Sequence, residues 1–518
     1  MIRRTLAAAM IALMAVAGLG GQSASARTET VPQSGPQSVP QPVPRPAPRP
    51  AGLAQTDRMT AATTLARAPQ TADGAILDKA RVSGISGWMA VDLDTGRVIS
   101  AHEADHAFAP ASVAKLPTAF FALDRLGPQH RFVTRVAATG PVRNETLEGD
   151  LILVGGGDPE LDTDALLPLV MGTREAGFSK ITGRFLVDTR GIEARAAIDP
   201  DQPVDAPYNP GISGLNLNFN RARIKWGKEG IRVSAHAARL DPEVASIRLT
   251  RAGAPGAPLF DFKSDGMTES WQMSQEAMKR PGERWLPVKN PAPYCGQVFR
   301  DLALTYGIRL GAPKIGSGTG ARVIATHQSR PLGPMLRSML KYSTNITAEA
   351  VGLASSNAAG IKGSAMVMNQ WAARVAGFAP DDPGFQLANH SGLTTQSRLS
   401  PRRTVALLQA LAKRPDGTHP RLPGPAPAYL KTHNVATKKD KLDYKNLDVV
   451  AKTGTMDYIR GLAGYIATPG GKRLAFAIFS NDLDRRDGGV RRVNRRWLGR
   501  ARGLEGKLIR NWVRRVDG

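Results

Sequence analysis

The apolar and polar positions become regular from about residue 87, where they predict a β-hairpin and then a helix. Residues 87–94 have the composition of a strand, Asp94-Thr95-Gly96 favours a turn, and residues 97–100 return as a second strand. From residue 112 the apolar side chains recur every three or four positions instead. This period predicts an amphipathic helix, which ends before Gly127-Pro128.

The pattern changes between residues 132 and 285, where short β-like runs alternate with turns rich in Gly, Pro and Asp. We interpret this stretch as an inserted β-rich module. Helical periodicity then returns over residues 298–306, 333–341 and 347–355. Near the C-terminus the sequence predicts three consecutive antiparallel strands, at residues 448–452, 461–467 and 474–480.

The N-terminal region carries an export signal and a spacer. Residues 1–26 combine two arginines, an apolar stretch and an Ala-x-Ala site, which are typical of a secretory signal peptide. Residues 27–76 include a segment rich in Pro, Gln, Ser and Ala, which predicts an extended linker. The remainder divides into a domain built from residues 77–131 and 286–518, interrupted by the insertion at 132–285. We expect a periplasmic protein, either soluble or peripherally attached to a membrane.

The net charge indicates which class of partner the protein binds, and the cysteine content indicates whether it can form a disulfide. The formal net charge is +25, which in an exported protein indicates anionic wall polymers or lipid head groups rather than nucleic acid. Residues 485–518 hold twelve basic and three acidic side chains around a helical apolar stripe, so they predict a basic amphipathic helix. This helix can close the domain by packing on the sheet, attach to an anionic surface, or do both. The single cysteine, Cys295, has no disulfide partner and is interpreted as structural.

Three short motifs follow one another along the chain. They are Ser112-Val113-Ala114-Lys115 at the start of a predicted helix, Ser343-Thr344-Asn345 between two helices, and Lys452-Thr453-Gly454 at the end of a strand. Each motif is common by chance. All three in this order and in matching local structure indicate a serine acyl-transfer enzyme.

The chemistry of this enzyme class assigns a role to each residue. Three residues of helix place Ser112 and Lys115 on one face, so a neutral Lys115 amine can accept the Ser112 proton. Its pKa must be lowered for this role, by burial and by a second cation, which we predict to be Lys452. Ser343 would relay the proton to the leaving amine. We assign substrate binding to Asn345, Lys452, Thr453, Gly454 and Thr455, with the Ser112 and Thr455 backbone N–H groups as oxyanion hole.

The motifs and their surroundings resemble the class C low-molecular-mass penicillin-binding proteins, which are D-alanyl-D-alanine carboxypeptidases and endopeptidases. Residues 108–115, Gly149-Asp150-Leu151 and Gly157-Asp158-Pro159 carry the resemblance, as do the 231 residues between the first two motifs. It implies an α/β (α+β) fold, a penicillin-binding transpeptidase-like domain whose antiparallel sheet lies between helices, with inserted domains. It also implies peptidoglycan peptides as substrates, β-lactams as inhibitors, and no metal or organic cofactor.

Two alternatives and one departure qualify this prediction. A β-lactamase shares the three motifs, and a peptidoglycan-binding or sensing protein with weak catalysis could retain them. The family usually has Asp-Gly-Ser-Gly-Leu-Ser where this chain has residues 389–394, Asn-His-Ser-Gly-Leu-Thr. A lost acidic residue there would alter activity or specificity.

Residues 102–106 match the zinc-binding pattern His-Glu-x-x-His, but they lie between a strand and Pro110, so we expect a connecting loop.

Overall fold

The computed structural model describes residues 73–252, 259–318, 320–415, 419–422, 424–435, 446–486 and 494–518. The predicted signal peptide and most of the predicted linker lie outside these residues. No helix among the described residues is both long enough and apolar enough to span a bilayer.

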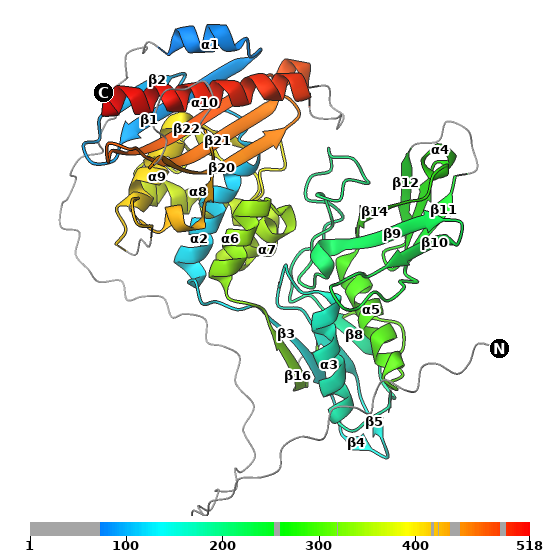
Figure 1. Ribbon diagram of the computed structural model, residues 1–518. Coiled ribbons are helices and arrows are strands. Elements are labelled where there is room, and N and C mark those ends of the chain that lie inside the picture. Colours follow the sequence, from blue (N-terminus) through cyan, green and yellow to red (C-terminus); the bar gives the residue numbers. More distant parts are fainter. Residues whose placement is uncertain are drawn as a thin grey trace, which may run out of the picture. The chain divides into compact units, whose positions relative to one another are not determined.

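A six-stranded antiparallel sheet forms the centre of one domain (Figure 1), with strand order β19-β20-β21-β22-β1-β2. The predicted hairpin is present as β1 (Ile85–Asp92) and β2 (Val98–His102). The three predicted C-terminal strands are also present, as β20 (Asp448–Met456), β21 (Ile459–Ala467) and β22 (Arg473–Asn481). A two-residue strand, β19 (Lys431–Thr432), pairs with β20 only at Val450 and Ala451.

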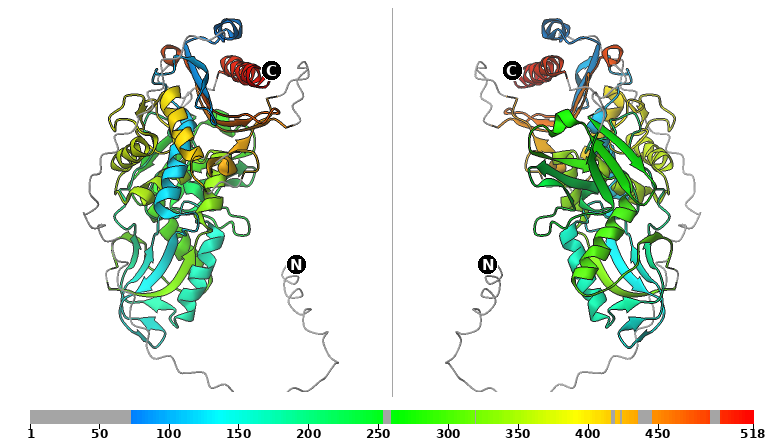
Figure 2. Two further views of the ribbon diagram at one scale, coloured as in Figure 1. Left: turned by 90° about the vertical axis from the view of Figure 1, so that its left-hand side faces the viewer. Right: turned by 90° about the vertical axis from the view of Figure 1, so that its right-hand side faces the viewer.

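Helices cover both faces of this sheet. Alternate side chains of a strand point to opposite faces, and this double cover therefore buries nearly every residue of β20 to β22. One face packs against α2 (Lys115–Leu126), α8 (Ile361–Ala376) and α9 (Pro401–Ala412). The other packs against α1 (Gly74–Ala80) and α10 (Arg495–Asp517), as Figure 2 shows. The predicted antiparallel sheet between helices is confirmed.

The predicted C-terminal amphipathic helix is confirmed as α10. Its apolar stripe, including Leu504, Leu508 and Trp512, is fully buried against the sheet. The opposite face is basic and exposed, with Arg495, Arg496, Arg500, Arg502, Lys507, Arg514 and Arg515. This helix therefore closes the domain while presenting a cationic surface.

The insertion is rich in strands, but its described residues also form three α-helices. A five-stranded sheet has the order β15-β8-β6-β3-β16, and its strands are β3 (Val133–Ala138), β6 (Leu151–Val154), β8 (Phe185–Asp188), β15 (Lys314–Ile315) and β16 (Arg322–Gln328). A small sheet joins β4 (Val142–Arg143), β5 (Thr146–Leu147) and β7 (Lys180–Ile181). The three helices are α3 (Thr163–Glu175), the short α4 (Gln275–Met278) and α5 (Pro291–Thr305).

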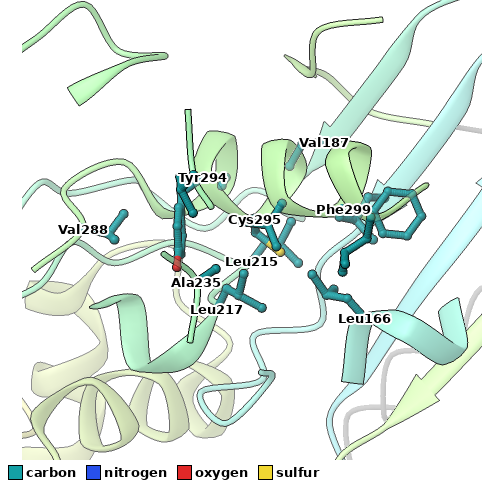
Figure 3. Packing of buried hydrophobic residues seen from close by; sticks show 14 of the residues in the cluster. Leu166, Val187, Leu215, Leu217, Ala235, Val288, Tyr294, Cys295 and Phe299 are labelled. Atoms are coloured by element: carbon teal, nitrogen blue, oxygen red, sulfur yellow. The ribbon is translucent and has the colours of Figure 1, made fainter. Parts of the chain in front are cut away.

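Two three-stranded sheets complete the insertion. One has the order β10-β9-β14, with β9 (Arg221–Gly227), β10 (Gly230–Ser234) and β14 (Gly282–Pro287). The other has the order β11-β13-β12, with β11 (Ile247–Arg251), β12 (Phe260–Ser264) and β13 (Glu269–Met273). Cys295 on α5 lies in the apolar core of this module, beside Leu215 and Leu217 (Figure 3). Burial raises the pKa of its thiol, which fits a structural role.

The insertion extends beyond residue 285, where the sequence placed its end. The strands at 314–315 and 322–328 belong to its five-stranded sheet, and the helix at 291–305 packs in its core. The chain closes the module where the Phe132 N–H donates to Ser329 Oγ at 2.9 Å and the Ser329 N–H donates to the Phe132 carbonyl. We therefore propose a module that runs from residue 132 to about residue 329.

Candidate active site

Ser112 and Lys115 come from a 3-10 turn, η1 (Ala111–Ala114), that leads directly into α2. Lys115 is completely buried, and its Nζ lies 3.0 Å from Ser112 Oγ. The same Nζ donates to Asn345 Oδ1 at 2.6 Å and to the Ser391 carbonyl at 2.7 Å. A neutral amine has two N–H groups and one lone pair. With both N–H groups given to these acceptors, the lone pair is left for the Ser112 hydroxyl.

The surroundings of Lys115 favour this neutral state. Burial lowers its pKa well below the ordinary value, and the nearby Lys452 charge lowers it further. The carboxylate of Glu349 acts in the opposite direction. Lys452 therefore has the predicted electrostatic effect on Lys115, although burial is the larger cause.

Ser343 and Asn345 lie at the junction of α6 (Leu332–Tyr342) and α7 (Asn345–Ser356). Ser343 has a left-handed backbone, with φ of 61°, and this ends α6 and turns the side chain toward β20. Its Oγ accepts a hydrogen bond from Lys452 Nζ at 3.0 Å, so among the described residues Ser343 is linked to Lys452 rather than to Lys115. Asn345 also donates through Nδ2 to the Tyr208 carbonyl of the insertion at 2.9 Å.

The third motif lies on an open strand edge. Because β19 covers β20 only at Val450 and Ala451, residues 452–456 have no strand neighbour on that side among the described residues. An extended peptide can add to such an edge through backbone hydrogen bonds. Lys452 is buried, and burial, Arg460 and Lys431 lower its pKa to about 7.

The structure gives Gly454 a packing role in addition to the substrate-binding role predicted for it. A Cβ at this position would lie 2.3 Å from the Pro110 carbonyl oxygen and 3.1 Å from the Val113 nitrogen. Gly454 therefore lets β20 approach the turn that carries Ser112.

The altered segment at residues 389–394 still supports the nucleophile. Asn389 Oδ1 accepts a hydrogen bond from the Gly392 N–H at 2.8 Å, a contact that an aspartate could also make. Gly392 has φ of +73°, and a Cβ on it would lie 1.9 Å from the Ala111 carbonyl oxygen. The turn is thus packed directly against the Ser112 turn, and the Asn side chain preserves its shape without the acidic charge.

His390 fills the position at which the family has a glycine. Its ring is fully buried, burial lowers its pKa to about 3, and its Nε2 lies 2.7 Å from Ser364 Oγ. A Cβ on Gly352 of α7 would lie 2.2 Å from the His390 ring. The neutral ring therefore adds no charge near Lys115, and Gly352 provides the space for it.

Replacing Gly352 with alanine should destabilise the fold by about 1–3 kcal/mol, because the new methyl group overlaps the His390 ring. The double variant with His390→Ala should recover part of this loss, since it removes the overlapping atoms. Urea unfolding of the four proteins in a double-mutant cycle measures the coupling. Additive effects of the two substitutions would contradict this packing relation.

Glu349, which no sequence motif marked, supports the turn at residues 389–392 through hydrogen bonds. Its carboxylate is completely buried and accepts from the backbone N–H groups of His390 at 3.1 Å and Ser391 at 2.8 Å. These contacts fix the Ser391 carbonyl that binds Lys115. The position of Glu349, four residues after Asn345 on α7, was the only available signal.

A second missed residue is Arg460 of β21, which is paired in register with Thr455. Its Nη1 donates to Thr455 Oγ1 at 2.9 Å, and its other nitrogens form a two-point ion pair with Glu505 of α10 at 2.7 and 2.9 Å. The buried pair orients the Thr455 hydroxyl at the strand edge. It also links α10 to the site.

These residues surround a cleft of about 240 Å³, whose lining includes Ser112, Ser343, Asn345 and Thr455. The insertion contributes Gln202 and Tyr208 to the lining, and the segments after β20 and β22 contribute Asp457 and Arg486. No motif marked these four residues in the sequence. The structure thus brings together Ser112, which is the predicted nucleophile, the second-motif residues Ser343 and Asn345, and Thr455 around one cavity.

The zinc-like pattern at residues 102–106 does not form a metal-binding helix. His102 ends β2, and the following residues form a loop, as expected. Within the described ranges, no group of three or more His, Cys, Asp or Glu side chains is arranged to hold a metal ion.

Comparisons with known proteins agree with this geometry. A family model described as the D-Ala-D-Ala carboxypeptidase 3 (S13) family matches residues 70–495. A D-alanyl-D-alanine carboxypeptidase of Actinomadura sp. (strain R39) is 27% identical over 443 residues, covering 79% of this chain and 80% of that protein. D-alanyl-D-alanine carboxypeptidase DacB of Haemophilus influenzae is 22% identical over 441 residues, covering 76% of this chain and 85% of that protein.

A solved structure shows the same fold. The crystal structure of penicillin-binding protein 4 (dacB) from Haemophilus influenzae matches with a TM-score of 0.70 at 20% identity, covering 86% of this chain and 100% of that one. The predicted resemblance and fold class are confirmed. Because the matching family model spans all three motifs, the chain belongs to the D-Ala-D-Ala carboxypeptidase 3 (S13) family of serine-type peptidases.

Proposed function

We propose that this family member hydrolyses D-alanine-terminated peptidoglycan peptides through an acyl-enzyme on Ser112, and that it also cleaves peptide cross-links. The observation that carries the proposal is the hydrogen bonding of Lys115. In a neutral Lys115, the two N–H groups would donate to the Asn345 and Ser391 oxygens. The remaining lone pair would then face Ser112 Oγ, which lies 3.0 Å from Nζ. A lysine with a lowered pKa in this position is a general base.

The reaction follows from these contacts. The Ser112 proton passes to Lys115 Nζ as Oγ bonds to the carbonyl carbon before the terminal residue. Backbone N–H groups of Ser112 and Thr455 would stabilise the oxyanion, typically by about 3 kcal/mol for each donor. The C–N bond then breaks, and the proton that Lys115 took from Ser112 passes to the leaving amine through the Ser343 hydroxyl, which must turn from its contact with Lys452 toward Lys115. Water attacks the ester in the same manner and regenerates the Ser112 hydroxyl.

The other assigned residues would hold the substrate along β20. Asn345 lines the cleft, and Thr453 and Thr455, which line the neighbouring cavity, would bind the terminal carboxylate. Lys452 contacts Ser343 and can raise the local positive potential around that carboxylate. β-Lactams would acylate Ser112 as substrate mimics. A solved structure of the Haemophilus influenzae relative contains a β-lactam.

The location is proposed from the sequence. The predicted signal peptide, which lies outside the described residues, would deliver the protein to the periplasm. The exposed basic face of α10 would then favour peripheral attachment to an anionic wall polymer or membrane surface.

The intact mass of the purified protein after treatment with a penicillin tests the central step. We expect one adduct, mapped to the peptide that contains Ser112, and none in Ser112→Ala. Release of D-alanine and turnover of the penicillin then distinguish a carboxypeptidase from a β-lactamase. A folded protein without an adduct would contradict the acyl-enzyme and favour a wall-binding role.

A further inference from the structure

A second cavity, of about 360 Å³, adjoins the catalytic cleft at Thr455. Thr453, Thr455 and Ala451 form one wall, since alternate residues of a strand face the same side. The remaining lining comes from the end of α6, from β19 and the residue after it, from β21 and from α10, and consists of Leu340, Lys341, Lys431, His433, Arg460 and Arg502. We call this cavity the cationic pocket.

The pocket has more positive than negative charge. Arg460 is neutralised by its ion pair with Glu505, which also interacts with Arg502. Lys341 and Lys431 are exposed and have no carboxylate partner among the described residues. Burial lowers the pKa of His433, the hydrogen bond with the Ala451 carbonyl raises it, and the charges of Lys431, Arg460 and Lys452 lower it further, so the net effect disfavours a cationic imidazole.

The direction of a bound peptide places the cationic pocket on the leaving-group side. A substrate along the open edge of β20 has its reacting carbonyl at Ser112 and Thr455. One half then lies over the cleft beside Met456 and Asp457, and the other lies toward Thr453. Ser343 and Lys452, which serve the leaving amine in the proposed function, lie at the Thr453 end.

We infer that the cationic pocket binds a second negative charge on the leaving half of the substrate. The enzyme would then favour an acidic cross-linked peptide, whose leaving amine belongs to an amino acid with an additional carboxylate, over a peptide that releases D-alanine. The methyl side chain of D-alanine can neither fill this cavity nor pair with its lysines. This inference rests on the proposed function, because that function assigns the leaving side.

Binding to Ser112→Ala tests the pocket without requiring catalysis. Two peptides would be compared by calorimetry, identical except for a last residue of D-glutamate or its neutral isostere D-glutamine. We expect the D-glutamate peptide to bind roughly tenfold more tightly at low salt, and the preference to shrink as salt is added. Equal dissociation constants for the two peptides would overturn the inference.

Variants identify the source of any preference. In the Ser112→Ala background, Lys431→Met and Lys341→Met should each bring the ratio of the two dissociation constants closer to one. Lys472→Met, which changes an exposed lysine in the turn between β21 and β22, should leave the ratio unchanged. A preference that persists in both pocket variants would also overturn the inference. Both pocket lysines are exposed, and thermal unfolding checks that the variants remain folded.

Parallel assays on the unmodified enzyme separate this inference from the proposed function. Penicillin acylation and D-alanine release without a charge preference would refute only the cationic pocket. A charge preference in an enzyme that forms no acyl adduct would support the pocket and refute the proposed catalysis.

Discussion

Replacing Lys115 with methionine should slow acylation of Ser112 by about 10²–10⁴-fold, the usual contribution of a general base. Methionine has a similar length and places no unpaired charge in this buried site, although the Asn345 and Ser391 oxygens lose their donor. The measurement is the rate of labelling by a fluorescent penicillin, together with urea unfolding to confirm that the fold persists.

The pH dependence provides a second readout for Lys115. The base must be neutral, so the acylation rate of the unmodified enzyme should rise with pH as Lys115 loses its proton. Because burial and Lys452 lower this pKa, the rise should occur well below the ordinary range of lysine. The rise should be absent in Lys115→Met and retained in the control Lys472→Met. A rate in Lys115→Met within a few-fold of the unmodified enzyme would exclude Lys115 as the base.

Changing Glu349 to glutamine should move this rise in rate to lower pH. The negative charge of Glu349 favours the protonated form of Lys115, so its removal lowers the Lys115 pKa and leaves more neutral amine at acidic pH. The maximum rate should fall as well. A glutamine amide can accept one of the two N–H bonds from His390 and Ser391 but places an NH₂ group against the other.

The pH profile separates an electrostatic role for Glu349 from a purely structural one. Glu349→Asp retains the charge and should keep the rise near its original pH, even if the shorter side chain lowers the maximum rate. An unchanged profile in Glu349→Gln would mean that the carboxyl group is already neutral. A purely structural role would lower stability and maximum rate without any shift along the pH axis.

The central contacts of the site were predictable because the motifs are local. A three-residue helical spacing was sufficient to pair Ser112 with Lys115, and strand composition was sufficient to place Lys452 on β20. The supporting residues were not predictable in this way. Arg460 and Glu505 are 45 residues apart and meet only because α10 packs on the sheet. Tyr208 reaches Asn345 from another module, 137 residues away.

The fold was predicted least well where distant segments pair. The end of the insertion was placed too early because β16 has an ordinary strand pattern, and only its pairing with β3 assigns it to that module. The helix at 291–305 was attributed to the catalytic domain because its periodicity does not indicate which core it faces. The neutral His390 ring was unexpected for a related reason, since the space for it comes from Gly352 on another element.

The closure of the insertion at Phe132 and Ser329 has a consequence for how the catalytic domain assembles. These residues are 197 positions apart, yet they share two hydrogen bonds. If the insertion folds before the catalytic segments dock, it would act as a short connection, and the two catalytic segments would meet with little more loss of chain entropy than a tight turn requires. This geometry would also let an ancestral single-domain enzyme acquire the module at one loop, without altering the order in which its own helices and strands dock.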